Sequence, residues 1–89
     1  MSVLLITYDL NNETKRPPIV AKIKELYPAW ARLSESSYAV STSDEPKTVY
    51  DKLSPMLDSN DNLLVITLST PWWGQHRKQD VIDWLKGSL

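Results

Sequence analysis

The chain has 89 residues, ten basic and eleven acidic, so its formal net charge is -1 and its length is that of one domain, residues 1–89. General nucleic-acid binders are usually clearly basic, so contact with RNA or DNA would have to use a local patch. The absence of cysteine excludes disulfides and thiolate metal sites, and no apolar run approaches the ~20 residues that span a membrane. We therefore expect a cytoplasmic protein with no signal peptide and no membrane partner.

Two strongly apolar strands are predicted, over residues 2–8 and 63–68. Both strands carry apolar or β-branched side chains on both of their faces. Neither shows the alternation of apolar and polar residues that is typical of a strand with one solvated face. We therefore expect both faces of each strand to be covered.

A helix, a hairpin and a second helix are predicted between these two strands. Thr14 can cap the first helix, and Pro17 and Pro18 occupy its first turn, where missing N–H groups cost little. Pro28 ends this helix. Its apolar stripe consists of Ile19, Ile23, Leu26 and Tyr27.

The hairpin is predicted to consist of two short strands, at residues 29–33 and 37–42. The second helix begins near Pro46, and Pro55 predicts a kink or an early end of that helix. Its apolar stripe consists of Val49, Leu53, Met56 and Leu57.

The order β-α-β-β-α-β is the ferredoxin-like pattern, so the predicted fold class is α+β, a ferredoxin-like sandwich with a C-terminal helical tail. Right-handed crossovers place both helices on one face of a four-stranded antiparallel sheet. Residues 2–68 form the core and residues 69–89 the tail, whose helix near 77–86 is stopped by Gly87. The other sheet face needs a cover, which is either a second copy in a homodimer or the chain's own tail.

Asp9 is the candidate for chemistry, because it follows the first strand directly and a polar loop begins after it. Two such carboxylates, brought together by a dimer axis, would form a site for Mg²⁺ or Mn²⁺. In the alternative interpretation, Asp9 begins the loop and accepts a hydrogen bond from the backbone of Asn11 or Asn12 in an Asx-turn.

Two cationic segments are candidates for contact with phosphate. Residues 75–78 follow Trp72 and Trp73, a pattern that predicts either base stacking with phosphate contacts or two tryptophans that anchor the tail. This segment holds the only histidine, which has no partner at the spacing of a metal site or a catalytic triad. Lys15 and Arg16 either neutralise phosphate near the strand end or form a solvated helix start.

Several short motifs occur in a familiar order. They are Tyr8-Asp9-Leu10, Arg16 at a helix start, Arg32 in a short strand, Ser36-Ser37-Tyr38-Ala39-Val40, and the strand Asp61-Asn62-Leu63-Leu64-Val65-Ile66. In these motifs the chain resembles the small CRISPR-associated endonuclease superfamily, which contains the second Cas protein and the virulence-associated protein D ribonucleases. It is most similar to the short bacterial SinR-like members. The resemblance covers residues 2–68, whereas the tail departs from the CRISPR branch, which usually adds a fifth strand there.

The resemblance implies that Asp9 corresponds to the catalytic and metal-binding aspartate of the nuclease members, in which a symmetric pair of these residues holds a divalent metal. It places Ser36 or Ser37 at the hairpin serine and Arg16 loosely at the helix start. Members of the family include nucleases as well as structural DNA-binding scaffolds.

Three functions remain open, and we rank a dimeric scaffold without strong catalysis first. That scaffold binds nucleic acid through Lys15, Arg16 and Arg32, or binds a protein partner. The alternative is an enzyme, a divalent-metal-dependent endoribonuclease or endonuclease that uses a symmetric Asp9 pair. The third is a structural or regulatory dimer that acts on another protein.

Overall fold

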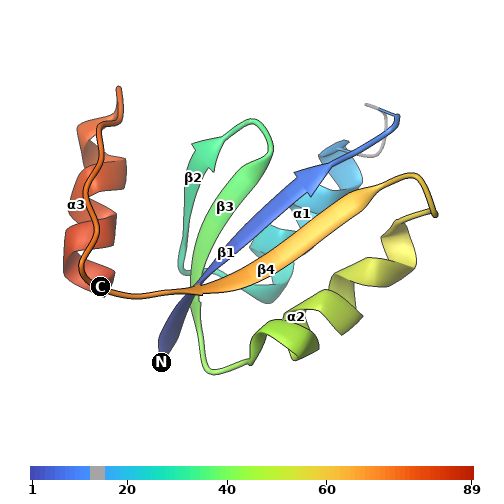
Figure 1. Cartoon of the computed structure of the whole chain (residues 1–89), viewed down its shortest axis with the longest axis horizontal. Coiled ribbons are helices and arrows are strands. Elements are labelled where there is room, and N and C mark those ends of the chain that lie inside the picture. Colours follow the sequence, from blue (N-terminus) through green and yellow to red (C-terminus); the bar gives the residue numbers. More distant parts are fainter. Residues whose placement is uncertain (13–15) are drawn as a thin grey trace.

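Four strands and three α-helices make up the part of the chain that the computed structural model describes, residues 1–12 and 16–89, with Arg16 described by its backbone alone. Figure 1 shows their arrangement. In chain order they are β1 (Ser2–Asp9), α1 (Arg16–Leu26), β2 (Trp30–Ser34), β3 (Ser37–Thr42), α2 (Pro46–Leu53), the short 3-10 helix η2 (Ser54–Met56), β4 (Asn62–Leu68) and α3 (Gln79–Ser88).

The strands form one sheet in the order β2-β3-β1-β4, and all neighbouring strands are antiparallel. The predicted α+β class is confirmed. Strands β1 and β3 are central, so β2 and β4 are the edges. Helices α1 and α2 lie behind the sheet in Figure 1, whereas α3 lies beside β2, apart from the other two helices.

The core lies between the sheet and helices α1 and α2. Because side chains alternate along a strand, every second residue of β1 and β3 points toward these helices. The predicted apolar stripes of both helices meet these residues, so the periodicity argument is confirmed. The buried residues of this cluster are Leu4, Ile6, Tyr8, Ile19, Ile23, Tyr27, Tyr38, Val40, Val49 and Leu53.

A polar network joins the end of α1 to α2 at the edge of this core. The Tyr27 hydroxyl donates to Asp44 Oδ2 over 2.9 Å, and Lys52 Nζ donates to the same oxygen over 2.7 Å. Burial, and then the hydrogen bond to Asp44, raises the pKa of the Tyr27 phenol above its usual range. The hydrogen bonds from Lys52 and Tyr27 hold the pKa of the Asp44 carboxyl below its usual value.

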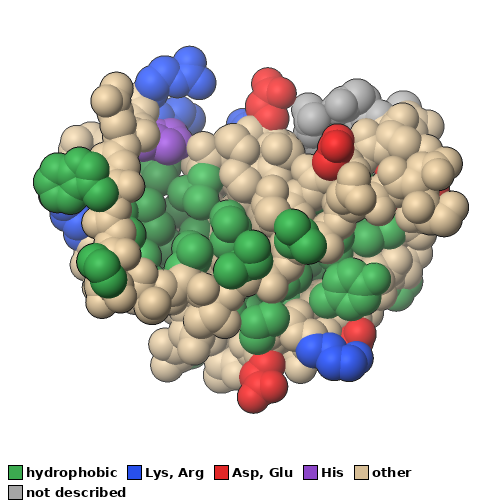
Figure 2. Space-filling model, in the orientation of Figure 1, with side chains coloured by type: hydrophobic (Ala, Val, Ile, Leu, Met, Phe, Trp, Pro, Cys, Tyr) green, Lys and Arg blue, Asp and Glu red, His purple; other side chains and the backbone are tan. Residues whose placement is uncertain are grey.

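The opposite sheet face, seen from the front in Figure 2, is covered only in part, and hydrophobic side chains gather over it. Val3 and Ala39 are buried, and Val81 of α3 is buried against the β2 side. At the β4 edge, Leu64 is 60% exposed and Ile66 46%.

Within one chain, the expected cover is therefore incomplete at β4, and cover by a second copy stays a prediction. The tail packs on its own sheet, as one alternative predicted. The helix α3 is only ten residues long and lies along β2, so it covers one side of the face and leaves the other open. We call Leu64 and Ile66 the apolar strip.

Two boundary predictions have different outcomes. The α-helical part of α2 ends at Leu53 and Pro55 falls in η2, so the predicted early end is confirmed. Gly87 was expected to stop the last helix, but α3 continues to Ser88 and the Leu89 N–H donates to the Leu85 carbonyl over 2.9 Å. Glycine stops a helix by adopting a positive φ, and Gly87 does not.

The proposed cap at Thr14 lies outside the described residues. Within those residues, no helix is both long and apolar enough to cross a membrane.

Candidate functional site

Asp9 is the last residue of β1, lies opposite Asn62 of β4, and is exposed. Among the described residues, its carboxylate takes part in no hydrogen bond and no ion pair. The Asx-turn predicted with Asn11 does not form, because the Asn11 N–H donates to Asp61 Oδ1 over 2.8 Å. The Asp9 carboxylate is therefore accessible to a ligand in solution.

The described part of one chain brings no further ligand set to Asp9. No group of three or more His, Asp or Glu side chains in residues 1–12 and 16–89 could hold a metal ion. The Asp61 carboxylate accepts hydrogen bonds from the backbone N–H groups of Asn11 and Asp58, over 2.8 and 3.0 Å. The described residues of one chain thus offer no complete ligand set for Mg²⁺ or Mn²⁺, and oxygen ligands from a second copy or a substrate would add to Asp9.

The hairpin serines lie at the same end of the sheet as Asp9. The Tyr8 N–H donates to the Ser36 carbonyl over 2.9 Å, which ties the β2–β3 turn to the end of β1. The hydroxyls of Ser34 and Ser37 lie 2.6 Å apart, and the Ser36 N–H donates to Ser34 Oγ over 3.2 Å. These contacts give the serines a structural role in the turn.

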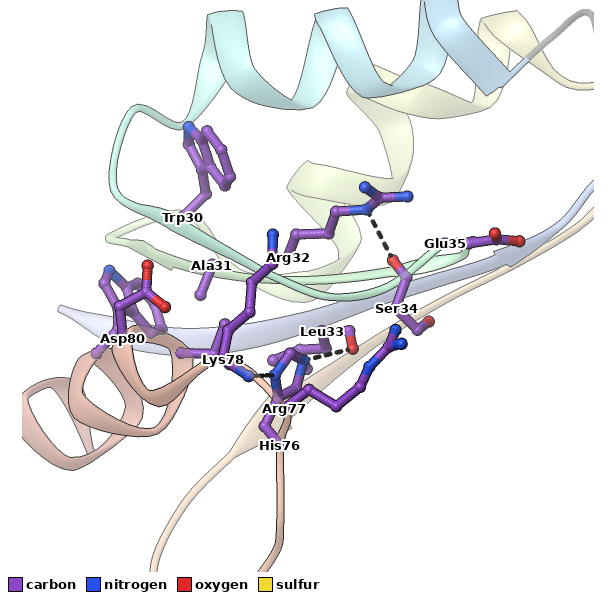
Figure 3. A pocket seen from close by; sticks show the side chains of 12 residues that line it. Trp30, Ala31, Arg32, Leu33, Ser34, Glu35, His76, Arg77, Lys78 and Asp80 are labelled. Carbon is purple, nitrogen blue, oxygen red and sulfur yellow. Dashed lines mark hydrogen bonds between the residues drawn. The ribbon is translucent and has the colours of Figure 1, made fainter.

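A groove of about 600 Å³ lies at the β2 edge of the sheet, between β2 and the segment that leads into α3. We call it the β2–α3 groove, and Figure 3 shows it from close by. It is lined by Trp30, Ala31, Arg32, Leu33, Ser34, Glu35, His76, Arg77, Lys78, Asp80, Val81 and Trp84.

His76 joins the tail to β2 at an irregularity in the strand. The pairing of β2 with β3 shifts register between Arg32 and Ser34, which leaves Leu33 as an extra residue. The Lys78 N–H donates to His76 Nδ1 over 3.0 Å, so the ring proton resides on Nε2, which donates to the Leu33 carbonyl over 3.0 Å. Both ring nitrogens are engaged, and His76 positions the tail.

Three cationic side chains line the β2–α3 groove: Arg32 from β2, and Arg77 and Lys78 from the tail. In Figure 3, Lys78 rises beside Arg32, while Arg77 extends along β2 toward Ser34. Arg32 Nε donates to the Ser34 carbonyl over 3.4 Å. Within residues 1–12 and 16–89, none of the three cations forms an ion pair with a carboxylate.

The structure thus brings one predicted nucleic-acid-binding residue, Arg32, together with the cationic tail segment. Lys15 lies outside the described residues, as does the side chain of Arg16, so the structure places neither cation. Sequence reasoning identified Arg77 and Lys78 as a dense cationic segment but did not connect them with Arg32. No local signal links residues so far apart in the chain.

The tryptophans differ in what they contact. The ring of Trp30 lies 5.7 Å from that of Tyr38, and Lys24 Nζ lies 4.5 Å above it. Trp84 is half-buried and lines the groove. Trp72 is half-buried, but Trp73 is 99% exposed, so the expectation that both tryptophans anchor the tail is wrong for Trp73.

Comparison with known sequences assigns no family to the chain. No protein-family model matches the chain, and no curated protein is significantly similar to it.

Proposed function

We propose that this protein is a homodimeric, ferredoxin-like scaffold that binds nucleic acid through the β2–α3 groove and does not catalyse cleavage. The observation that carries the proposal is the convergence of Arg32, Arg77 and Lys78 on one groove. These side chains come from segments more than forty residues apart, and they outnumber the two carboxylates of the groove lining, Glu35 and Asp80.

The ferredoxin-like assignment is supported by the strand order β2-β3-β1-β4 and by the two helices on one sheet face. The same order is consistent with the proposed relationship to the small CRISPR-associated endonuclease superfamily. The chain has no cysteine, which suits the reducing cytoplasm that we propose as its location.

Phosphate is the ligand chemistry that fits these cations. A guanidinium donates two parallel hydrogen bonds to a phosphate, and an ammonium adds a mobile point charge. Because the net charge of the chain is -1, long-range attraction of a polyanion is weak. Affinity must therefore come from the local charge of the groove.

A scaffold fits this site better than an enzyme. The only histidine uses both ring nitrogens to hold the tail on β2, so it is not poised as a general base. The exposed carboxylate at the end of β1, Asp9, lies outside the set of residues that line the groove. Binding and any metal chemistry would therefore occupy different parts of the surface.

The homodimer is supported by the apolar strip on the open face of an edge strand. Leu64 and Ile66 are large apolar side chains that a second copy would remove from water. A two-fold axis beside β4 would bring the two strips together in a self-complementary contact.

Binding of a fluorescently labelled single-stranded oligonucleotide, followed by anisotropy at low salt, tests the proposal. The double substitution Arg77→Ala/Lys78→Ala should weaken binding about tenfold and make its salt dependence shallower. The double substitution Lys22→Ala/Lys47→Ala removes the same charge from α1 and α2 and should leave binding unchanged. Equal loss in both variants would contradict the groove assignment, and undetectable binding by the wild-type protein would contradict the function.

A metal-dependent nuclease is the second candidate, favoured by the exposed Asp9 carboxylate with no bond among the described residues. In that case a symmetric Asp9 pair would hold Mg²⁺ or Mn²⁺, which would supply Lewis-acid activation of the scissile phosphate. Cleavage of RNA or DNA that is lost on chelation and in Asp9→Asn would establish this candidate over the scaffold.

A further inference from the structure

The β2–α3 groove combines an apolar floor with charged side chains of both signs, because Glu35 and Asp80 line it together with three cations. Its cations, Arg32, Arg77 and Lys78, are exposed, whereas Ala31 and Val81 are each only 6% exposed. An anion-binding patch alone would not need an apolar floor. We infer that the groove binds a nucleotide unit of an unpaired strand, with the base against Trp84 and its phosphates at Arg32 and Arg77, an inference that rests on the proposed function.

Trp84 is the indole available for stacking. It lies one helical turn after Val81, so both side chains lie on the face of α3 that borders β2. Among the described residues, Trp84 makes no ring–ring or cation contact. The ring of Trp30 is less available, because Tyr38 and Lys24 already lie against it.

The apolar part of the groove discriminates between paired and unpaired strands. In a duplex the bases are stacked and only the phosphates and groove edges are accessible, so the indole and the apolar floor would stay unused. In an unpaired strand, a base can stack on an aromatic side chain while the backbone contacts nearby cations. The volume of about 600 Å³ is that of a small-ligand pocket, so the groove holds a short unit of the strand.

An acidic peptide that adds a strand to β2 fits this edge less well. Strand addition needs a regular row of free backbone groups. Here the register shift at Leu33 interrupts the row, and the Leu33 carbonyl already accepts a hydrogen bond from His76 Nε2. The helix α3 also lies beside the strand. The edge is therefore protected against β-pairing, and side chains provide the binding surface.

NMR of the whole wild-type protein tests the inference without a substitution. Short oligothymidylate, the same sequence in a duplex with oligodeoxyadenylate, free thymidine monophosphate and an oligoglutamate peptide are titrated separately. We expect the unpaired strand to shift the indole N–H signal of Trp84 and the amide signals of Leu33 and Val81. The amide signals of Val49 and Leu53 in α2, outside the groove, should stay unshifted and serve as the internal reference.

Substitutions provide a second readout. Trp84→Ala should weaken binding of the unpaired strand about fivefold or more, whereas Trp84→Phe, which keeps an aromatic ring, should retain most of it. Tyr50→Ala, at an exposed aromatic residue on α2 outside the groove, is the control and should not change it. If Trp84→Ala loses the dispersed spectrum of a folded protein, the wild-type titration and Trp84→Phe decide the question.

The outcomes separate this inference from the proposed function. Equal binding of duplex and unpaired strand, with an unmoved Trp84 indole, would overturn the inference and leave the scaffold standing. No binding of any oligonucleotide would overturn both. Thymidine monophosphate that binds as tightly as the strand would support nucleotide binding in the groove but would identify a free nucleotide as the ligand. A shift caused by oligoglutamate alone would overturn the inference.

Discussion

Asp44 joins two helices through one carboxylate oxygen, which accepts hydrogen bonds from Tyr27 and Lys52. Lys52 Nζ also lies 5.9 Å from the centre of the Tyr27 ring. The Tyr27–Asp44 hydrogen bond is partly buried, and the Lys52–Asp44 pair is less exposed than the pair of Lys47 and Asp51, so both interactions of Asp44 are less screened. Asp44 should therefore affect stability more than other carboxylates on the described surface.

Asp44→Asn should lower the urea midpoint of unfolding near pH 7. It should also make that midpoint less dependent on pH in the acid range. The pKa of Asp44 is lowered in the folded state, so its carboxylate stabilises the fold above the unfolded pKa, near 3.8, and this contribution is lost as pH falls through the folded value. Urea unfolding between pH 7 and about pH 3 measures both effects. Asp51→Asn, a substitution in an exposed pair, should change the urea midpoint little. If the midpoints of Asp44→Asn and wild type decrease identically as the pH falls, the role of Asp44 is refuted.

Asp9→Asn should leave the folding free energy within about 0.5 kcal/mol of wild type, because the exposed carboxylate has no bond among the described residues. If the protein is the scaffold that we propose, wild type and variant should both leave RNA and DNA intact in the presence of Mg²⁺. Thermal unfolding and a gel-based cleavage assay measure the two properties. Robust wild-type cleavage that the variant lacks would reverse our ranking of scaffold and nuclease.

At the scale of elements, α3 contacts the rest of the fold mainly at β2. It packs on β2 through Val81, and the preceding segment is held by His76. The sheet and the two helices behind it have a separate, larger core. We therefore expect α3 to open locally before the rest of the domain unfolds.

Val81→Ala should destabilise the attachment of α3 by about 1–2 kcal/mol, because it removes two buried methyl groups. Hydrogen exchange of the backbone amides measures this opening. Exchange should accelerate in α3 and remain slow in β1 and β3. Asp83→Ala, on the exposed side of the same helix, is the control, and acceleration of the whole domain would show that α3 does not open on its own.

At the scale of the whole molecule, the sheet has one fully covered face and one half-open face. Helix α3 covers the β2 side of the open face, and the apolar strip remains at the β4 side. A small domain gains stability from additional burial of apolar surface. Association through the strip would supply that burial and would leave the β2–α3 groove accessible on the far edge of each copy.

Wild-type protein should sediment as a dimer at micromolar concentration, and Leu64→Lys/Ile66→Lys should sediment as a monomer. The introduced ammonium groups cannot be desolvated in an apolar contact without a partner. Tyr50→Lys, at a 44% exposed aromatic residue on α2, is the matched control and should remain dimeric. A monomeric wild-type protein would rule out the homodimer at that concentration.

The sequence by itself determined the elements and the helix-facing core, because side-chain periodicity is a local property. The stripe of Ile19 and Ile23 and the alternation of β1 placed these residues correctly. The strand-end position of Asp9 was also predicted from the sequence. The sequence pattern could not predict where the tail lies. Trp72 and Trp73 are the same type of residue, yet Trp72 is half-buried and Trp73 is exposed.

Only the tertiary structure decided which distant residues meet and which apolar residues stay exposed. The two faces of β4 are equally apolar in sequence, but α3 lies along β2 and so leaves Leu64 and Ile66 open. The same placement of α3 brings Arg77 to Arg32 and forms the β2–α3 groove. Such contacts depend on where the chain runs after β4. That path is determined by the burial of apolar surface across the whole molecule, which a local pattern of residues does not reveal.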